Sequence, residues 1–148
     1  MKIYFDTSVI SALFDSMNPE RKSLTEDFFS KIASFDVYIS EITIIEVEKT
    51  PDEFLRDKMR MVIKTFSVLK ITDKVEELAN VYLQYKAVPE SYYEDCYHIA
   101  IATINEMDYL LSWNFRHIVR KKTKDIVRMV NTLRDLKQVE IITPAELL

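Results

Sequence analysis

The sequence contains no glycine among its 148 residues, whereas an average chain carries about 7%. Glycine is needed where a backbone turns tightly or approaches a phosphate closely. Its absence therefore excludes three kinds of glycine-dependent site: the dinucleotide-binding loop, the phosphate-binding loop of nucleotide hydrolases, and the calcium loop of helix–loop–helix proteins.

Cysteine and histidine are almost as scarce. Cys96 is the only cysteine, and His98 and His117 are the only histidines. These counts exclude an internal disulfide and any zinc or iron–sulfur site with several cysteines, and they disfavour a histidine-rich metal site. Carboxylates are plentiful, with 24 aspartate and glutamate residues. A metal bound by this chain is therefore expected to be a hard cation, Mg²⁺ or Mn²⁺.

Long apolar runs are also missing. No stretch approaches the ~18 residues of a membrane-spanning helix. Asp6 interrupts the N-terminal apolar run Ile3–Phe5 with a charge too early for a secretory signal peptide. The net charge is −4 and 48% of the residues are hydrophobic, which is enough for a core at this length. We expect one cytoplasmic domain, residues 1–148, without membrane contact.

Short apolar runs alternate with longer amphipathic stretches. The runs predict strands at Ile3–Phe5, Val37–Ile39, Val68–Ile71, Tyr109–Leu111 and Val139–Ile142. Helical periodicity predicts helices over about residues 20–34, 41–49, 52–66, 73–86, 91–105 and 123–137. Strands that alternate with helices need crossover connections. The predicted fold is therefore α/β, with three α/β/α layers around a central five-stranded parallel sheet.

Some helix boundaries carry sequence signals. Side-chain oxygens suited to capping a helix start are found at Asn18 before Pro19, at Asp73 with Glu76, and at Ser91 with Glu94. In a chain without glycine, Asn105 is the residue best suited to a left-handed helix end.

Polar side chains stand where the predicted strands end. They are Asp6 after the first strand, Glu46 in the helix after the second, Asp95 in the first turn of the helix after Pro89, and Ser112 and Asn114 after the fourth strand. The carboxyl ends of parallel strands carry the site in open α/β sheets, and Ser8 is placed to orient Asp6. Converging carboxylates repel one another, and a divalent cation relieves this repulsion. Such a cation can activate water and polarise a phosphoryl oxygen.

Five segments, taken in order and spacing, resemble a PIN domain, close to the VapC-like toxin branch. They are Phe5–Ile10, Glu46, Glu94–Ala102, Leu110–Phe115 and Ile142–Leu148. The resemblance spans the whole chain and implies a Mg²⁺- or Mn²⁺-dependent endoribonuclease. It also implies an RNA substrate, a small antitoxin partner and a homodimer.

The resemblance also assigns the site residues. The acidic positions of the family, which hold the metal, fall on Asp6, Glu46 and Asp95. The fourth position falls on Asn114, with Ser112 in the hydroxyl place and Ser8 supporting Asp6. The family usually has aspartate at the fourth position. Asn114 is expected to assist the three acids in binding the catalytic metal through its carbonyl oxygen, but it brings no charge, so we expect weaker metal affinity and a less favoured second metal.

Two other functions stay open at this stage. One is a catalytically weak or inactive module on the same fold that binds RNA or protein, which the asparagine at position 114 favours. The other is a phosphotransfer enzyme with Asp6 as nucleophile, as in haloacid-dehalogenase-like phosphatases. It ranks last, because Ser8 stands where those enzymes carry a second aspartate.

Four other residues have simpler interpretations. We expect His98 to be a packed or hydrogen-bonded core histidine, Cys96 to pack as a small hydrophobe, and Trp113 to anchor its loop. For His117, substrate contact and local packing are equally favoured.

Charge is distributed unevenly. Residues 114–137 contain eight basic and two acidic residues, a net charge of +6, whereas residues 1–113 have a net charge of −8. Positive charge just after Asn114 could follow a phosphate backbone. Arg116, Arg120 and Lys121 are the predicted RNA contacts, and about half of the basic residues are expected to form only a solvated helix face.

Overall fold

A parallel sheet of five strands forms the centre of the computed structural model, which describes all 148 residues. The strands are β1 (Lys2–Phe5), β2 (Asp36–Ser40), β3 (Ser67–Leu69), β4 (Tyr109–Leu111) and β5 (Glu140–Ile142). Their order is β3-β2-β1-β4-β5, and Ile3 of β1 pairs with Val37 of β2 and Tyr109 of β4. The predicted fold class and strands are confirmed. β3 stops before Ile71, whose N–H donates to the Glu41 carboxylate at 2.7 Å.

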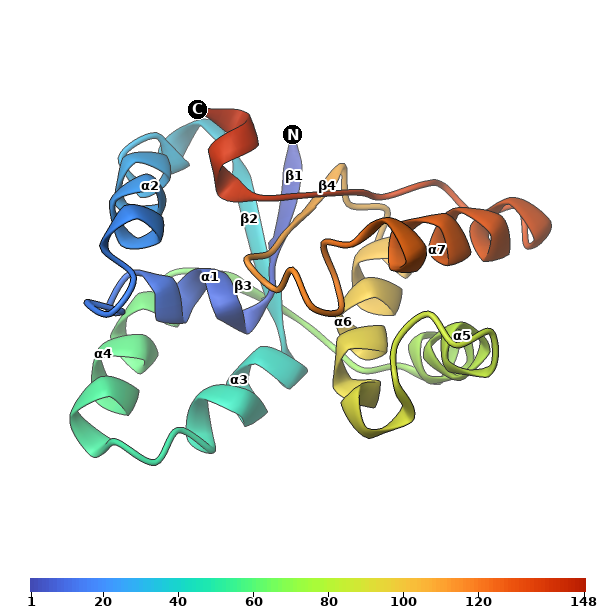
Figure 1. Cartoon of the computed structure of the whole chain (residues 1–148), viewed down its shortest axis with the longest axis horizontal. Helices are drawn as coiled ribbons and strands as arrows, with labels where there is room; N and C mark the ends of the chain where they lie inside the picture. Colours follow the sequence, from blue (N-terminus) through green and yellow to red (C-terminus); the bar gives the residue numbers. More distant parts are fainter.

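Helices cover both faces of this sheet (Figure 1). They are α1 (Thr7–Ala12), α2 (Pro19–Phe29), α3 (Glu41–Glu48), α4 (Glu53–Ile63), α5 (Asp73–Gln84), α6 (Tyr93–Ile104) and α7 (Lys121–Leu133). Helices α1–α4 lie on one side and α5–α7 on the other. No helix is both long and apolar enough to cross a bilayer.

The strand side chains divide the core into two layers. Successive residues of a strand point to opposite faces, so Ile3 and Phe5 pack with α1, α2 and α4, whereas Tyr4 packs with α5 and α6. Leu110 and Leu111 divide in the same way. The central strands β1 and β4 are mostly buried and, apart from Lys2, apolar, which is why their sequence positions were predictable.

Helix α1 lies outside the predicted helices. It has only six residues, too few to show a helical period, and it begins directly after β1. Asp6 caps it by accepting a hydrogen bond from the Val9 N–H at 3.3 Å. The next helix begins as predicted, with Asn18 as the cap and Pro19 in the first turn.

Two predicted helix starts are wrong. Helix α5 is capped by Thr72, whose hydroxyl accepts from the Val75 N–H at 3.3 Å, and not by Asp73. The capping box predicted for Ser91 and Glu94 does not form, because a 3₁₀ turn (Glu90–Tyr92) leads into α6 without a side-chain cap. Either oxygen of a neighbouring polar pair can cap a helix, so the sequence alone does not select between them.

Helix ends also differ from the predictions. Helix α2 ends at Phe29, before a separate 3₁₀ turn (Ile32–Ser34), and α7 covers Lys121–Leu133 instead of residues 123–137. Asn105 has an ordinary φ of −89°, and the left-handed residue is its neighbour Glu106 at 54°.

Three helices end on a left-handed residue that is not glycine. These residues are Lys86, Glu106 and Asp135, which follow α5, α6 and α7. In each case the next residue donates its N–H to a carbonyl five positions earlier, as Met107 does to Ala102 at 2.9 Å. This is the Schellman arrangement that glycine normally completes. The chain thus makes tight helix ends without glycine, at a conformational cost.

Candidate active site

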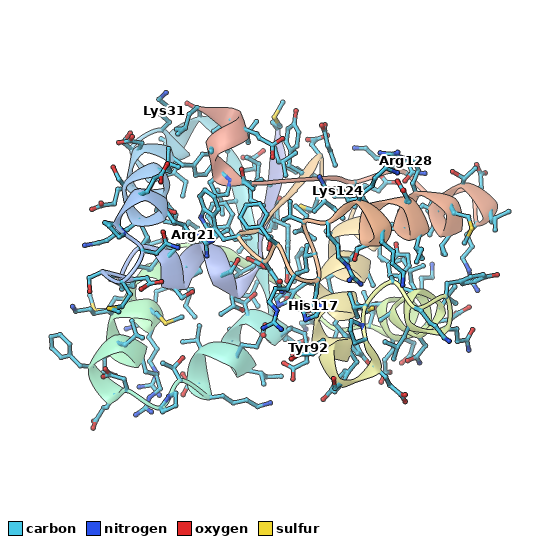
Figure 2. The ribbon with its side chains drawn as sticks, in the orientation of Figure 1. Arg21, Lys31, Tyr92, His117, Lys124 and Arg128 are labelled. Carbon is cyan, nitrogen blue, oxygen red and sulfur yellow. The ribbon has the colours of Figure 1, made fainter.

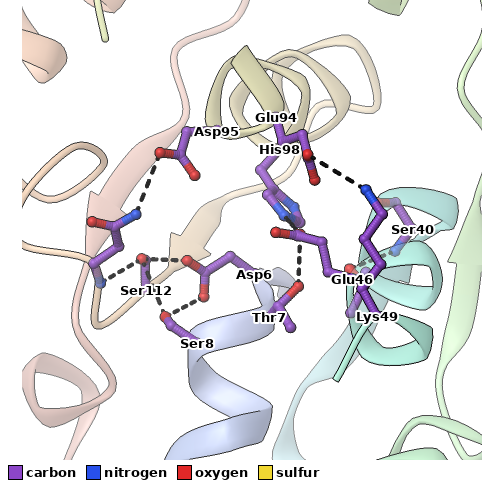
Figure 3. Close-up of polar contacts among 12 residues, drawn as sticks. Asp6, Thr7, Ser8, Ser40, Glu46, Lys49, Glu94, Asp95, His98 and Ser112 are labelled. Carbon is purple, nitrogen blue, oxygen red and sulfur yellow. Dashed lines mark hydrogen bonds and ion pairs between the residues drawn. The ribbon is translucent and has the colours of Figure 1, made fainter. Parts of the chain in front are cut away.

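Asp6 lies at the centre of the candidate site, between the carboxyl ends of the adjacent strands β1 and β4 (Figure 3). The connections from β1 and β4 lead to opposite faces of the sheet, which is where open α/β sheets form their sites. Asp6 is only 3% exposed. The Ser8 hydroxyl donates to one carboxylate oxygen at 2.5 Å and the Ser112 hydroxyl donates to the other. Burial raises the pKa of Asp6, and the charge of His98 and the two hydroxyls offset this only in part.

Glu46 faces this region from α3. One of its carboxylate oxygens accepts a hydrogen bond from the Thr7 hydroxyl at 2.8 Å and is paired with Nε2 of His98. Burial would raise the pKa of Glu46, but the hydrogen bond and charge of His98, together with Thr7, outweigh it and lower the pKa. Glu41 and Glu48 of the same helix are exposed, so Glu46 is the glutamate of this helix that reaches the site.

His98 joins the site to the core. It is buried, and its Nδ1 lies 2.6 Å from the Tyr4 hydroxyl, which in turn lies 2.7 Å from the Ser40 hydroxyl. Burial lowers the pKa of His98, but Tyr4, Glu46 and Asp6 outweigh it and hold the pKa well above its ordinary value. The prediction of a packed, hydrogen-bonded histidine is confirmed. Its contact with Glu46 was not predicted, although its spacing of one helical turn from Asp95 was a signal.

Asp95 completes the carboxylate cluster from the first turn of α6. The Asn114 amide donates to Asp95 Oδ2 at 3.4 Å. Burial raises the pKa of Asp95, His98 opposes this, and the charges of Asp6 and Glu46 add to it, which brings the pKa to about 7. The three predicted carboxylates therefore interact electrostatically at the carboxyl edge of the sheet.

Asn114 is held on both sides of its amide group. The nitrogen faces Asp95, and the oxygen accepts the His117 backbone N–H at 3.0 Å. The backbone N–H of Asn114 donates to Ser112 Oγ at 2.9 Å. In this arrangement Asn114 orients Asp95 and directs its own oxygen toward the loop.

The carboxylates suit a hard divalent cation in their chemistry. No three aspartate, glutamate, histidine or cysteine side chains already stand as ligands around one point. The like charges that raise the pKa of Asp95 are nevertheless those that a Mg²⁺ or Mn²⁺ ion would relieve. Asp6, Glu46 and Asp95 are the residues that could hold such an ion.

The loop after β4 is anchored to α2. Trp113 is buried, its indole N–H donates to the Thr25 hydroxyl at 2.9 Å, and the Arg21 guanidinium lies over its ring at 5.4 Å. The predicted anchoring role of Trp113 is confirmed. Cys96 is also buried as predicted, and burial together with Asp95 raises the pKa of its thiol to about 12.

The three predicted RNA-contacting residues have different surroundings. Arg116 is exposed and makes no hydrogen bond or ion pair. The Arg120 guanidinium donates to the Ala87 carbonyl at 3.1 Å and to the Thr123 hydroxyl at 2.8 Å. Lys121 is exposed and pairs with Asp125 at 2.6 Å. Arg120 therefore joins α7 to the loop after α5.

Solved structures of similar fold include a toxin–antitoxin complex from Klebsiella pneumoniae, with 16% identity and a TM-score of 0.63 over 96% of this chain and 97% of that one. VapC20 of Mycobacterium tuberculosis, a sarcin–ricin loop cleaving toxin, has 16% identity and a TM-score of 0.61 over 76% of this chain and 89% of its own. VapBC-1 from nontypeable Haemophilus influenzae has 14% identity and a TM-score of 0.57 over 97% and 98%. At these identities the likeness shows the shared fold.

The sequence itself matches the family model of the PIN domain over residues 3–118. This span contains Asp6, Glu46, Asp95 and Asn114. No curated protein matches the chain. Because the matched span is well over half of the sequence, the resemblance is confirmed: the chain belongs to the PIN domain family.

Proposed function

We propose that this chain is a Mg²⁺- or Mn²⁺-dependent endoribonuclease, a single-domain cytoplasmic toxin of a toxin–antitoxin pair. One observation carries the proposal: Asp6, Glu46 and Asp95 meet at the carboxyl edge of the sheet, close enough for the first two to raise the pKa of Asp95. Membership of the PIN domain family supports the reaction class. The similar fold of the toxin–antitoxin complex from Klebsiella pneumoniae supports an antitoxin partner. The similar fold of VapC20, a sarcin–ricin loop cleaving toxin, supports RNA as substrate.

Each side chain of the site has a role in this mechanism. Asp6, Glu46 and Asp95 would hold the cation, which when bound supplies a water of lowered pKa and polarises a phosphoryl oxygen. Ser8 and Ser112 fix both oxygens of Asp6. His98 and Thr7 bind the same oxygen of Glu46, which leaves the other oxygen free. Asn114 holds Asp95 toward the cluster.

Metal binding and RNA cleavage measured on the same preparation test the proposal. The unmodified chain should bind Mn²⁺ in calorimetry and cleave single-stranded RNA, and Asp95→Asn should lose cleavage while keeping its fold by circular dichroism. Glu94→Gln is the matched control: Glu94 is adjacent to Asp95 but pairs with Lys49 at 3.8 Å, and this variant should cleave normally. A metal-binding protein that cleaves no RNA in the absence of antitoxin would falsify the enzymatic assignment.

A second function, a non-catalytic module that binds RNA or protein, is favoured by one observation. The Asn114 oxygen is bound to the His117 backbone, so the fourth family position adds neither a charge nor a free oxygen to the cluster. An inert module need not bind Mn²⁺, and calorimetry therefore separates the two functions. A homodimer is expected for the toxin, and light scattering with and without Mn²⁺ measures it.

A further inference from the structure

Two aromatic rings meet beside the carboxylate cluster. The Tyr92 and His117 rings have centroids 4.1 Å apart and planes inclined by 32°, and Figure 2 shows them together next to α6. Tyr92 ends the 3₁₀ turn that leads into α6, three residues before Asp95. His117 follows Asn114 by three residues, and its backbone N–H binds the Asn114 side chain at 3.0 Å. The pair is therefore fixed to the Asp95–Asn114 side of the site.

His117 is buried in a way that hydrogen bonding does not explain. It is 9% exposed, and neither ring nitrogen has a hydrogen-bond partner. Burial lowers its pKa, as do the charges of Arg120 and Arg116, so the ring is a neutral imidazole at neutral pH. An unpaired buried polar group costs stability. The uncharged ring of His117 packs against the ring of Tyr92 and supports it with a flat surface.

Tyr92 itself is largely open to solvent. It is 45% exposed although one face of its ring is covered by His117, and its hydroxyl makes no hydrogen bond within the protein. An exposed tyrosine without a polar partner, supported from behind by a second ring, presents a rigid flat surface. Single-stranded nucleic acids bind such surfaces by stacking their bases, with little sequence preference.

The charges nearby fit the same ligand. The carboxylate cluster disfavours an approaching phosphate unless a cation is bound, so affinity for RNA must come in part from other groups. Arg116, adjacent to His117 in the chain, is exposed and has no acidic partner. A nucleotide with its phosphate near the carboxylates would have a flat ring on the turn before α6 and an unpaired positive charge in the loop after β4.

We propose that Tyr92, backed by His117, is the platform on which one base of the single-stranded RNA stacks, next to the phosphate to be cleaved. This proposal rests on the proposed ribonuclease function and adds a base-binding site to it. Because stacking is tolerant of sequence, the platform fixes the position of the RNA without selecting a base.

RNA affinity of tyrosine variants tests the platform. The background is Asp95→Asn, which prevents cleavage, and the probe is a short fluorescent single-stranded RNA in Mn²⁺ buffer. Tyr92→Leu should weaken binding by about tenfold, the effect typical of one lost stack, whereas Tyr92→Phe and Tyr92→Trp should bind as the background does. Tyr93→Leu is the matched control: Tyr93 is 48% exposed but packs against Tyr97 instead of the loop.

A second probe separates stacking from a structural role. An abasic ribose-phosphate chain of the same length has the same charge but no bases. It should bind the background protein at least as weakly as RNA binds Tyr92→Leu, and Tyr92→Leu should weaken it no further. Equal RNA affinity of Tyr92→Leu and its background overturns the platform alone. If neither the background protein nor the unmodified chain binds RNA, both the platform and the proposed function are overturned.

Discussion

His98 brings a positive charge into the carboxylate cluster from the core. Its Nε2 is paired with Glu46, and its Nδ1 contacts the Tyr4 hydroxyl on β1. The same charge opposes the rise in the pKa values of Asp6 and Asp95 and contributes to the lowered pKa of Glu46. With Asn114 at the fourth family position, the cluster has three carboxylates and one imidazolium, a smaller net negative charge than four carboxylates. If the proposed function holds, this composition would favour one divalent cation over two.

The raised pKa of Asp95 predicts how the metal-free protein responds to pH. An aspartate in an unfolded chain has a pKa near 3.9, whereas Asp95 in the folded protein titrates at about 7. Between about pH 3.9 and 7, Asp95 is therefore protonated in the folded state and ionised in the unfolded chain. The free energy of unfolding falls as pH rises through this range, by up to about 1.4 kcal/mol per pH unit from this group. Above pH 7 the contribution of Asp95 is constant.

Urea unfolding in EDTA between about pH 5 and 8 measures this dependence. The unmodified chain should lose stability more steeply than Asp95→Asn, in which His98 still titrates but residue 95 does not. Added Mn²⁺ should restore stability at the upper end, because it binds the ionised cluster. Parallel curves for the two proteins would mean that Asp95 titrates as it does in the unfolded chain.

Asn114→Asp is predicted to strengthen Mn²⁺ binding. The change adds a carboxylate beside Asp95 and removes the amide donor that now holds it at 3.4 Å. In the metal-free protein the added charge increases repulsion within the cluster, so this variant should be less stable in EDTA and should gain more stability from Mn²⁺. Calorimetry should give at least severalfold tighter binding. Asn80→Asp, which adds the same charge on an exposed position of α5, should leave the affinity unchanged.

At the scale of helices and strands, the sequence predicted elements better than their ends. The strand positions were readable because the buried strands are short apolar runs, and Asp6 and Asp95 were located by their places after a strand and a helix start. Helix α1 was missed because six residues do not show a period. The left-handed conformation of Glu106 was not predicted, because residues other than glycine can also end a helix in this way when the hydrogen bonds that follow offset the backbone strain.

The sequence predicted that Asp6, Glu46 and Asp95 lie near the same edge of the sheet, but it did not predict their contacts. Glu46 and His98 are 52 positions apart in the sequence, and only the packing of α3 against α6 brings them together. The orientation of the Asn114 amide is also set by a non-local partner, Asp95. Sequence order gives the edge of the sheet where residues meet, whereas hydrogen bonds across elements require the folded backbone.

Helix ends without glycine predict that stability can be gained by adding it. Lys86 and Glu106 have φ values of 59° and 54°, a conformation that costs roughly 1 kcal/mol or more for a residue with a β-carbon. Glycine removes this cost, but its greater conformational freedom in the unfolded chain lowers the stability of the fold by about 0.4–1 kcal/mol. Lys86→Gly and Glu106→Gly should each stabilise by about 0.5 kcal/mol.

Urea unfolding of the single variants measures this gain. Asp135→Gly should gain less, because aspartate tolerates the left-handed region better than most residues do. Lys64→Gly, at the end of α4 where φ is an ordinary −57°, is the control and should be destabilising. A loss of stability in Glu106→Gly would show that contacts of the Glu106 side chain outweigh the strain of its backbone.

At the scale of the whole molecule, charge is separated along the chain. The basic segment 114–137, with its net charge of +6, follows the site and forms α7 on the face of the sheet covered by α5–α7. Lys124 and Arg128 lie along this helix (Figure 2). The rest of the chain is acidic. A polyanion is therefore expected to be attracted to this segment, although the net charge of the protein is negative.

The salt dependence of RNA binding tests which of these charges contact phosphate. Each phosphate neutralised on a single strand contributes about −0.7 to the slope of log affinity against log salt concentration. The sequence favours Arg116, Arg120 and Lys121 equally, but their surroundings differ. Arg116 is unpaired, whereas Arg120 is bound to the Ala87 carbonyl and Lys121 to Asp125.

In the Asp95→Asn background, Arg116→Gln should flatten the slope by about 0.7, and Lys121→Gln by less because its charge is already shared with an acidic neighbour. Arg120→Gln should lower the unfolding temperature, since it removes a contact between α7 and the loop after α5, with little change in slope. Binding should weaken alike for RNAs of different sequence, because phosphate contacts do not distinguish bases. An unchanged slope in Arg116→Gln would place the path of the RNA backbone away from this loop.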